Sequence, residues 1–251
     1  MKWVKGIMWS VTGLMFVVTT VSLPWMPDRM PMHFNMAGEI DRWGSKYENL
    51  LFPLFAVAMA AFFAYLASYY EKKSHEADAD AGEDATAKEA AGHRANANVL
   101  WMTGAVMAVY FACLQGSILY STYRAQTEGQ PFPSEVFSRL VFVLMGALFV
   151  ILGGLIPRTA RNGTVGVRVP WSLYNETTWR RSNRFGGILM IAAGVAVIVT
   201  ALLADVMLTL LLIPVYLLAA VAAMLVYAHH VWRQEKDREP SQSSAENAEK
   251  S

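Results

Sequence analysis

Long apolar runs separated by polar segments make up most of this 251-residue chain. Six of these runs are long enough to cross a membrane as helices, which takes about 20 mainly apolar residues. They lie near residues 6–23, 48–70, 97–120, 137–156, 185–203 and 206–228. The pattern therefore predicts an all-α fold, a polytopic membrane bundle of six transmembrane helices.

Composition favours the same fold class. Hydrophobic residues make up 55% of the chain and charged residues 16%, whereas a soluble domain carries roughly 25% charged residues. The net charge of +1 gives no general attraction to nucleic acid. The single cysteine, Cys113, lies inside an apolar run, which excludes an intrachain disulfide and a cysteine-based metal site.

The placement of lysine and arginine predicts the orientation, because these residues gather on the cytoplasmic side of a membrane protein. If both termini are cytoplasmic, five of the 21 basic residues lie outside and the remaining 16 lie inside. We therefore expect a multi-pass membrane protein with both ends in the cytoplasm. Leu23-Pro24-Trp25 follows the first run where a signal peptide would have its small-residue cleavage site, so we expect that run to stay as a helix.

The first outer loop, residues 24–47, is longer and more varied than a connector needs to be. Prolines, glycines, an asparagine and an aspartate stand in its sequence, so a helix or a strand is not expected there. We expect an ordered extracytoplasmic loop held against the bundle. Its candidate ligand-binding residues are His33, Asn35, Gly38, Asp41, Arg42 and Trp43. A plainer role for its aromatic residues is a belt at the membrane interface.

Two segments differ in composition from the rest. Residues 71–97 are dominated by alanine and charged residues and contain no aromatic or large aliphatic residue, and residues 233–251 are similar. Such segments cannot contribute to a buried core. We expect a flexible cytoplasmic loop, or a solvated helix, at 71–97 and a disordered cytoplasmic tail at 233–251.

The inner loop at residues 157–184 contains the other informative pattern. Asn162-Gly163 indicates a turn, and residues 164–169 alternate as in a short extended segment. Ser172 or Asn175 is a suitable cap for a short amphipathic helix ending near Arg184. Its tryptophans would face lipid headgroups or the bundle, and its arginines would face anionic phospholipid.

Polar residues and prolines inside the spans predict local features. Gln115 either joins two helices by a hydrogen bond or lines a ligand cavity. Pro53 and Pro214 predict kinks. The last two spans are joined at Asp205 with almost no loop, which predicts a tight hairpin, and Arg139 is expected to extend toward the outer headgroups. Three glycines in the fifth span predict close helix packing.

The candidate chemistry is not that of an enzyme. The outer loop contains one histidine, and its spacing fits no zinc motif. The sequence offers no nucleophilic triad, no phosphate-binding glycine loop and no acidic residue in the middle of a span. We therefore expect no catalytic residue, no metal and no cofactor.

Two motifs resemble a known family. The outer stretch PDRMPMHFNMAGEIDRW, preceded by LPWM, resembles a small uncharacterised membrane domain that often precedes the SdpI family. The inner stretch NGTVGVRVPWSLYNETTWRRSNRFGG resembles the SdpI signature itself. The positions that match are Asn162, Gly166, Arg168, Pro170, Trp171, Asn175, Trp179, Asn183, Arg184 and Gly187.

The resemblance implies a domain organisation. Residues 1–70 would form an N-terminal two-helix unit with the outer loop 24–47, and residues 98–232 would form a four-helix SdpI-like unit with the inner loop 157–184. Between them lies the segment 71–97, and the tail 233–251 follows.

The resemblance also implies a location and a function: a multi-pass immunity and signalling protein of the bacterial cell membrane that gives resistance to a secreted antimicrobial peptide toxin. The outer loop would bind the toxin, and the inner loop would pass that state to a cytoplasmic repressor or another protein. The expected partners are these two proteins and membrane lipid, with no direct contact to nucleic acid. The inner interface residues would be Asn162, Gly166, Arg168, Pro170, Trp171, Trp179, Asn183 and Arg184. A small exporter of a peptide or lipophilic compound, and a scaffold for assembly, are the alternatives.

Overall fold

The computed structural model describes residues 1–34, 40–79, 84–127 and 134–249. Within these ranges, six helices are long and apolar enough to cross a membrane. Their bounds are α1 Lys2–Ser22, α2 Leu51–Ala79, α3 Asp84–Thr127, α4 Ser134–Leu155, α5 Glu176–Leu203 and α6 Val206–Glu249. The predicted six-helix membrane bundle is therefore confirmed, and the chain is a multi-pass membrane protein.

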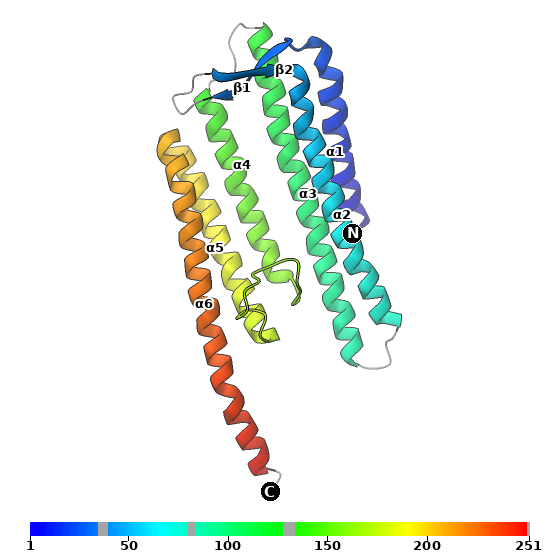
Figure 1. Ribbon diagram of the computed structural model, residues 1–251, viewed down its shortest axis with the longest axis vertical. Helices are drawn as coiled ribbons and strands as arrows, with labels where there is room; N and C mark the ends of the chain where they lie inside the picture. Colours follow the sequence, from blue (N-terminus) through cyan, green and yellow to red (C-terminus); the bar gives the residue numbers. More distant parts are fainter. Residues whose placement is uncertain (35–39, 80–83, 128–133, 250–251) are drawn as a thin grey trace.

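The helices form two groups of three (Figure 1). In the first, α3 packs against α1 and α2; in the second, α5 packs against both α4 and α6. The core of the first group includes Met8 of α1, Ala67 of α2 and Leu100 of α3, all nearly inaccessible to solvent. This grouping differs from the expected division into a two-helix and a four-helix unit, because α3 joins the N-terminal helices.

Glycines bring α4 and α5 into close contact, as the small residues of the fifth span predicted. A Cβ atom added to Gly194 of α5 would lie 2.5 Å from the carbonyl oxygen of Gly146 on α4. A Cβ atom on Gly187 would lie equally close, at 2.5 Å, to the carbonyl oxygen of Gly153. The two backbones therefore touch at two points about two turns apart, where a side chain has no room.

A β-hairpin forms in the first outer loop, where we expected no strand. β1 (Arg29–Phe34) pairs antiparallel with β2 (Ile40–Ser45), and Pro31 stands opposite Trp43. The prediction was wrong because Asn35 and Gly38 stand between the two strands in the sequence rather than within them. Pro31 is tolerated because both strands of a two-stranded sheet are edge strands.

The segments of low hydrophobicity are helical. α2 runs to Ala79 and α3 begins at Asp84, so the described part of 71–97 is helical, as in one of the two expected alternatives. An ion pair of 2.9 Å between Asp78 and Arg94 joins the two helices there. α6 continues to Glu249, through the tail that we expected to be disordered. Alanine, glutamate, lysine, arginine and glutamine, which are common in these segments, favour a helix. The expectation that residues 71–97 cannot contribute to a buried core was wrong, because the small side chains of Ala90 and Ala97 are buried and Ala97 belongs to the core of the first helix group.

The two ends of the bundle carry different structures (Figure 1). One end, called the hairpin end here, carries β1, β2 and the connection between α5 and α6. The other end carries the connection from α4 to α5, called the motif loop here and comprising residues 156–175. It begins with a short 3-10 helix, Ile156–Arg158.

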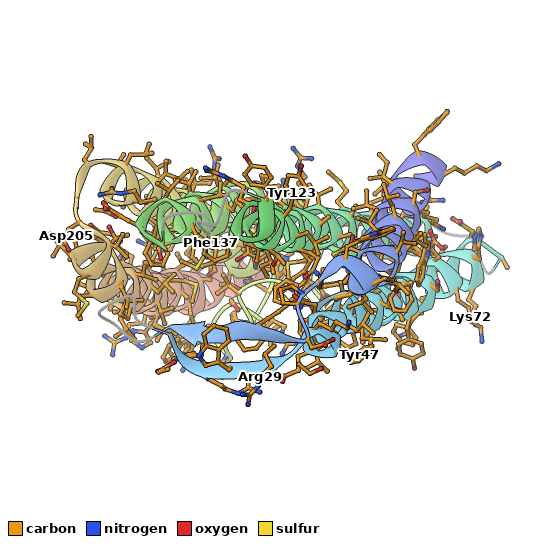
Figure 2. All side chains as sticks on the ribbon, turned by 90° about the horizontal axis from the view of Figure 1, so that it is seen from above. Arg29, Tyr47, Lys72, Tyr123, Phe137 and Asp205 are labelled. Atoms are coloured by element: carbon orange, nitrogen blue, oxygen red, sulfur yellow. The ribbon has the colours of Figure 1, made fainter. Side chains whose placement is uncertain are left out.

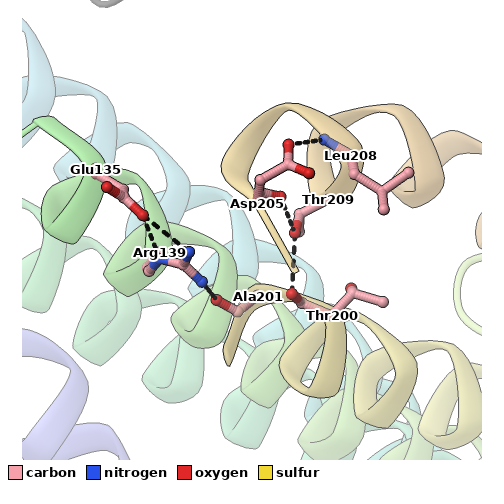
Figure 3. Close-up of polar contacts among 7 residues, drawn as sticks. All are labelled: Glu135, Arg139, Thr200, Ala201, Asp205, Leu208 and Thr209. Carbon is pink, nitrogen blue, oxygen red and sulfur yellow. Dashed lines mark hydrogen bonds and ion pairs between the residues drawn. The ribbon is translucent and has the colours of Figure 1, made fainter. Parts of the chain in front are cut away.

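The connection between α5 and α6 is the predicted tight hairpin (Figure 3). Asp205 accepts a hydrogen bond on Oδ1 from the backbone N–H of Leu208 at 2.8 Å, which caps the first turn of α6. The hydroxyl of Thr209 donates to the carbonyl of Thr200 at 3.1 Å and ties the two helices together.

Four predictions concerned polar residues and prolines inside the spans. Nη1 of Arg139 donates to the carbonyl of Ala201 at 2.7 Å, because the last carbonyls of α5 lack helical partners (Figure 3). Gln115 joins two helices by donating from Nε2 to Thr19 of α1 at 3.1 Å. Pro53 stands in the first turn of α2, where a proline removes no helical hydrogen bond. Pro214 lies inside α6 with an exposed side chain.

Candidate functional site

The β-hairpin formed by β1 and β2, called the hairpin from here on, is anchored to the bundle by apolar residues. Met30 of β1 is buried in a cluster with Leu23 and Met26, which follow α1, and Leu119 of α3 packs against this cluster. Buried Asn49 donates from Nδ2 to the sulfur of Met30 at 3.2 Å. One face of the hairpin is therefore fixed on the ends of α1 and α3, while other side chains remain exposed.

An ion pair closes the base of the hairpin. Nζ of Lys46 lies 2.8 Å from Oδ1 of Asp28, and the backbone N–H of Lys46 donates to the carbonyl of Asp28 at 3.3 Å. The hydrogen bond from Lys46, together with its charge, lowers the pKa of the Asp28 carboxyl below its ordinary value. Asp28 is therefore charged at neutral pH and holds Lys46 in place.

The structure brings two candidate ligand-binding residues together on the open part of the hairpin. Nδ1 of His33 lies 2.6 Å from Oδ1 of Asp41, and the two side chains are 65% and 42% exposed. Arg42 pairs with Glu48, and the ring of Trp43 is 54% exposed. The other two candidates, Asn35 and Gly38, lie outside the described residues.

The hairpin extends from the α1–α3 group toward the α4–α6 group (Figures 1 and 2). Figure 2 looks onto this end and places Arg29 and Tyr47 along one edge of the bundle. Trp25 and Tyr47 are 69% and 63% exposed, so aromatic rings as well as polar groups are available at this end of the bundle.

At the other end, Asn162 shapes the motif loop from within. Its Oδ1 accepts hydrogen bonds of 2.7 Å from the backbone N–H groups of both Thr164 and Val165, and its Nδ2 donates to the carbonyl of Ala160 at 2.7 Å. An asparagine side chain that takes the place of backbone partners in this way stabilises a turn. The turn predicted at Asn162-Gly163 therefore forms, but residues 164–169 form no strand.

Hydrogen bonds join the motif loop to the other helix group. Oδ1 of Asn96 on α3 accepts from the backbone N–H of Ala160 at 3.0 Å and from Nδ2 of Asn162 at 3.3 Å. The hydroxyls of Tyr70, on α2, and Thr164 lie 2.8 Å apart. The loop begins at α4 and ends at α5, so these contacts link the second helix group to the first.

Side chains from the first turns of α5 are hydrogen-bonded to the backbone of the motif loop. Trp179 is fully buried, and its Nε1 donates to the carbonyl of Thr159 at 2.9 Å. Oδ1 of Asn183 accepts from the backbone N–H of Val167 at 2.7 Å. Gly166 has a φ of +111°, and a Cβ atom there would lie 3.0 Å from the Trp179 ring, so only glycine fits.

The expected short amphipathic helix is therefore the start of α5 itself. Asn175 is its N-cap, and its Oδ1 accepts from the backbone N–H of Thr178 at 2.8 Å. Trp179 faces the bundle, which was one of its two expected environments. Of the predicted interface residues, Asn162, Gly166, Trp179 and Asn183 are turned inward and shape the loop.

The other predicted interface residues are available at the surface. Arg168, Pro170 and Arg184 are exposed, and the guanidinium of Arg168 donates to the carbonyl of Gly163. Trp171 is half-buried, with its ring 4.9 Å from the ring of His229 on α6.

His229 and its neighbour Trp232, whose rings lie 5.5 Å apart, were not among the predicted site residues. They continue the aromatic surface of the motif loop onto α6. The histidine stands at the end of the last apolar run, but the family motif stops before it, so nothing in the sequence linked the two.

Two cavities lie between the helix groups. One, of about 490 Å³, is lined by residues of α2, α3, α4, α5 and the motif loop, including Arg168. The other, of about 320 Å³, lies among α1, α3 and α4. Gln115 lines neither. Among the described residues, no group of three His, Cys, Asp or Glu side chains is placed to hold a metal ion.

Comparisons with known proteins match both motifs. Residues 158–228 match the SdpI/YfhL protein family, and residues 11–57 match the Domain of unknown function (DUF1648). The chain is also similar to the Immunity protein SdpI of Bacillus subtilis (strain 168), with 32% identity over 97 residues, which are 38% of this chain and 47% of that protein. The similarity thus spans about half the length of the curated relative. No solved structure matches the chain. The resemblance to the SdpI family is confirmed.

Proposed function

We propose that this membrane protein gives its cell immunity to a secreted, membrane-active peptide. The observation that carries the proposal is the similarity to the Immunity protein SdpI, at 32% identity over 97 residues. The motif loop, which lies in the segment that matches the SdpI/YfhL family, is closely hydrogen-bonded to both helix groups. Its geometry is therefore tied to the packing of the whole bundle.

The hairpin is the part that would bind the peptide. Lysine and arginine placement predicts that it lies outside the cell. His33 and Asp41 offer polar groups, and the exposed ring of Trp43 offers an apolar contact. An amphipathic peptide at the membrane surface presents apolar and charged side chains together, so a surface with both kinds of group suits it.

The helix α3 would connect this event to the opposite end of the bundle. It packs under the hairpin at Leu119 and bonds the motif loop at Asn96. The two residues are separated by roughly 35 Å at a rise of about 1.5 Å per helical residue. A peptide that shifts the hairpin would move α3 and the loop with it. Arg168, Pro170, Trp171 and Arg184 would then present the changed state to a cytoplasmic protein.

A survival experiment tests this function. A peptide-sensitive bacterium, with and without this protein, would be exposed to a panel of secreted membrane-active peptides. We expect protection against at least one peptide. The substitutions His33→Ala and Asp41→Ala should remove it at equal membrane abundance, and His75→Ala, an exposed histidine of α2 near the other end, should not. Absence of protection against every peptide would overturn the proposal, and full protection by both hairpin variants would overturn the role of the hairpin.

Arg168→Ala tests the second half of the mechanism. If the motif loop passes the state to a partner, this variant should still bind the peptide but lose protection. A variant that retains full protection would restrict the mechanism to capture of the peptide at the hairpin.

The two cavities between the helix groups favour a second candidate, a small exporter of a peptide or lipophilic compound. Proteoliposomes separate the two functions. An exporter should give substrate-dependent flux of the protective compound, whereas immunity by binding should give saturable binding without flux.

A further inference from the structure

The cavity of about 490 Å³ between the helix groups has an apolar wall. Phe62 and Leu66 of α2, Val99 of α3, Leu152 of α4 and Met190 of α5 contribute to it. Pockets for lipophilic ligands measure roughly 300–1,000 Å³, so the volume is sufficient for an apolar chain. Since Phe62 is exposed and belongs to a membrane span, the cavity opens toward the place where lipid chains lie.

One end of this cavity is polar and positively charged. Residues 164–166 of the motif loop line it together with Arg168. The Arg168 side chain is exposed, and no carboxylate of the described residues pairs with it. Its guanidinium donates to a backbone carbonyl, that of Gly163, and has further N–H groups free for an anion.

The surroundings of Arg168 strengthen its preference for an anion. Residues 157–184 contain six arginines and a single acidic residue, Glu176. Basic pockets between transmembrane helices are a known setting for anionic headgroups, and a guanidinium binds phosphate by two parallel hydrogen bonds.

We propose that this cavity is a binding site for an anionic phospholipid. One acyl chain lies in the apolar part between α2, α3, α4 and α5, and the headgroup phosphate binds Arg168. The lipid then fills the space between the two helix groups and contacts the motif loop at Gly166. This inference does not depend on the proposed immunity function, because it concerns lipid binding in the absence of any peptide.

Lipid binding by the purified full-length protein tests the proposal. Detergent-solubilised protein would be titrated with phosphatidylglycerol or with phosphatidylcholine, and retained lipid counted by native mass spectrometry. We expect one phosphatidylglycerol molecule to bind in preference to phosphatidylcholine. Arg168→Gln should weaken its binding about fivefold, the contribution of one basic residue near a membrane surface, and Arg168→Lys should retain most of the affinity.

Two further variants distinguish lipid binding in the cavity from general attraction of lipid to surface charge. Arg180→Gln removes an arginine that is also exposed but does not line the cavity, and it should leave the affinity unchanged. Thr103→Phe places a ring in the cavity and should reduce retention of phosphatidylglycerol while Arg168 remains intact. Thermal unfolding of each variant verifies that it is folded.

Three results would overturn the proposal. Equal retention of the two lipids would contradict the role of the headgroup. Equal loss in Arg168→Gln and Arg180→Gln would indicate general attraction to a basic surface. Unchanged retention in a folded Thr103→Phe protein would place the acyl chain outside the cavity.

Discussion

Asn183 of α5 and Val167 of the motif loop are joined by a buried hydrogen bond, in which Oδ1 of Asn183 accepts the backbone N–H of Val167 at 2.7 Å. The same side chain donates from Nδ2 to the carbonyl of Trp179 at 3.0 Å. Both polar atoms of the Asn183 side chain are therefore bonded to the backbone of the fold. Its place in the family motif follows from what it does for the loop backbone.

The substitution Asn183→Ala should lower the free energy of unfolding by about 1–3 kcal/mol, because it leaves the N–H of Val167 buried without a partner. Thermal unfolding of the purified protein in detergent measures the effect. Asn98→Ala, at an exposed position of α3, is the matched control and should unfold like the parent protein. If Asn183→Ala unfolded like the control yet abolished protection, Asn183 would act on a partner directly.

The contact between Gly194 and Gly146 makes a second substitution informative. Gly194→Val should separate α4 from α5, because even the first side-chain carbon would meet the Gly146 carbonyl oxygen at 2.5 Å. Overpacking of this kind costs typically about 1–3 kcal/mol. Gly13→Val on α1 is the control, since nothing lies within 4 Å of its added Cβ atom. Equal thermal stability of the two variants would contradict the close packing of α4 and α5.

The sequence predicted the elements that depend on local pattern and missed those that depend on distant partners. The spans and the tight connection between α5 and α6 at Asp205 follow from hydrophobic runs and their spacing, and both are confirmed. Trp179 illustrates the limit. A tryptophan after a polar loop suits a membrane interface as well as it suits the interior of the bundle. Its buried position depends on distant partners such as the carbonyl of Thr159, 20 residues earlier, and the local sequence does not reveal them.

The motif loop and the β-hairpin show the same difference between what a local pattern predicts and what distant partners determine. The motif pointed to the correct loop, but no pattern separates Asn162 and Gly166, which shape it, from the exposed Arg168. In the outer loop, the pairing of β1 with β2 depends on register across the connection, which turn-forming residues alone do not reveal.

Arg139 provides a third prediction, at the end of α5. Arg139→Gln removes the donor to the Ala201 carbonyl and should increase amide hydrogen exchange in the last turn of α5, with a loss of about 1 kcal/mol of stability. Glu135→Gln is the control: it removes the exposed ion pair to Arg139, worth roughly 0.3–0.5 kcal/mol, and preserves the bond to Ala201. A larger effect from Glu135→Gln would assign the stabilisation to the ion pair instead.

The ion pair of Asp28 and Lys46 gives a prediction for pH. Because Lys46 lowers the pKa of Asp28 in the folded protein, the pair stabilises the hairpin fully above the ordinary carboxyl pKa of 3.8. The stabilisation is lost as the pH falls through the lower pKa of the folded state. We therefore expect the base of the hairpin to loosen in acid, and Asp28→Asn to show that loosened state already at neutral pH.

The methyl resonance of Met30 reports this change, because Met30 is buried under the hairpin. It can be followed by NMR of protein labelled with ¹³C-methyl methionine and assigned with Met30→Leu. The parent protein should show a transition of this resonance below pH 3.8, while Asp28→Asn should lack it. If both proteins showed the same transition, the acid response would come from other carboxyl groups and the Asp28–Lys46 pair would not hold the hairpin closed.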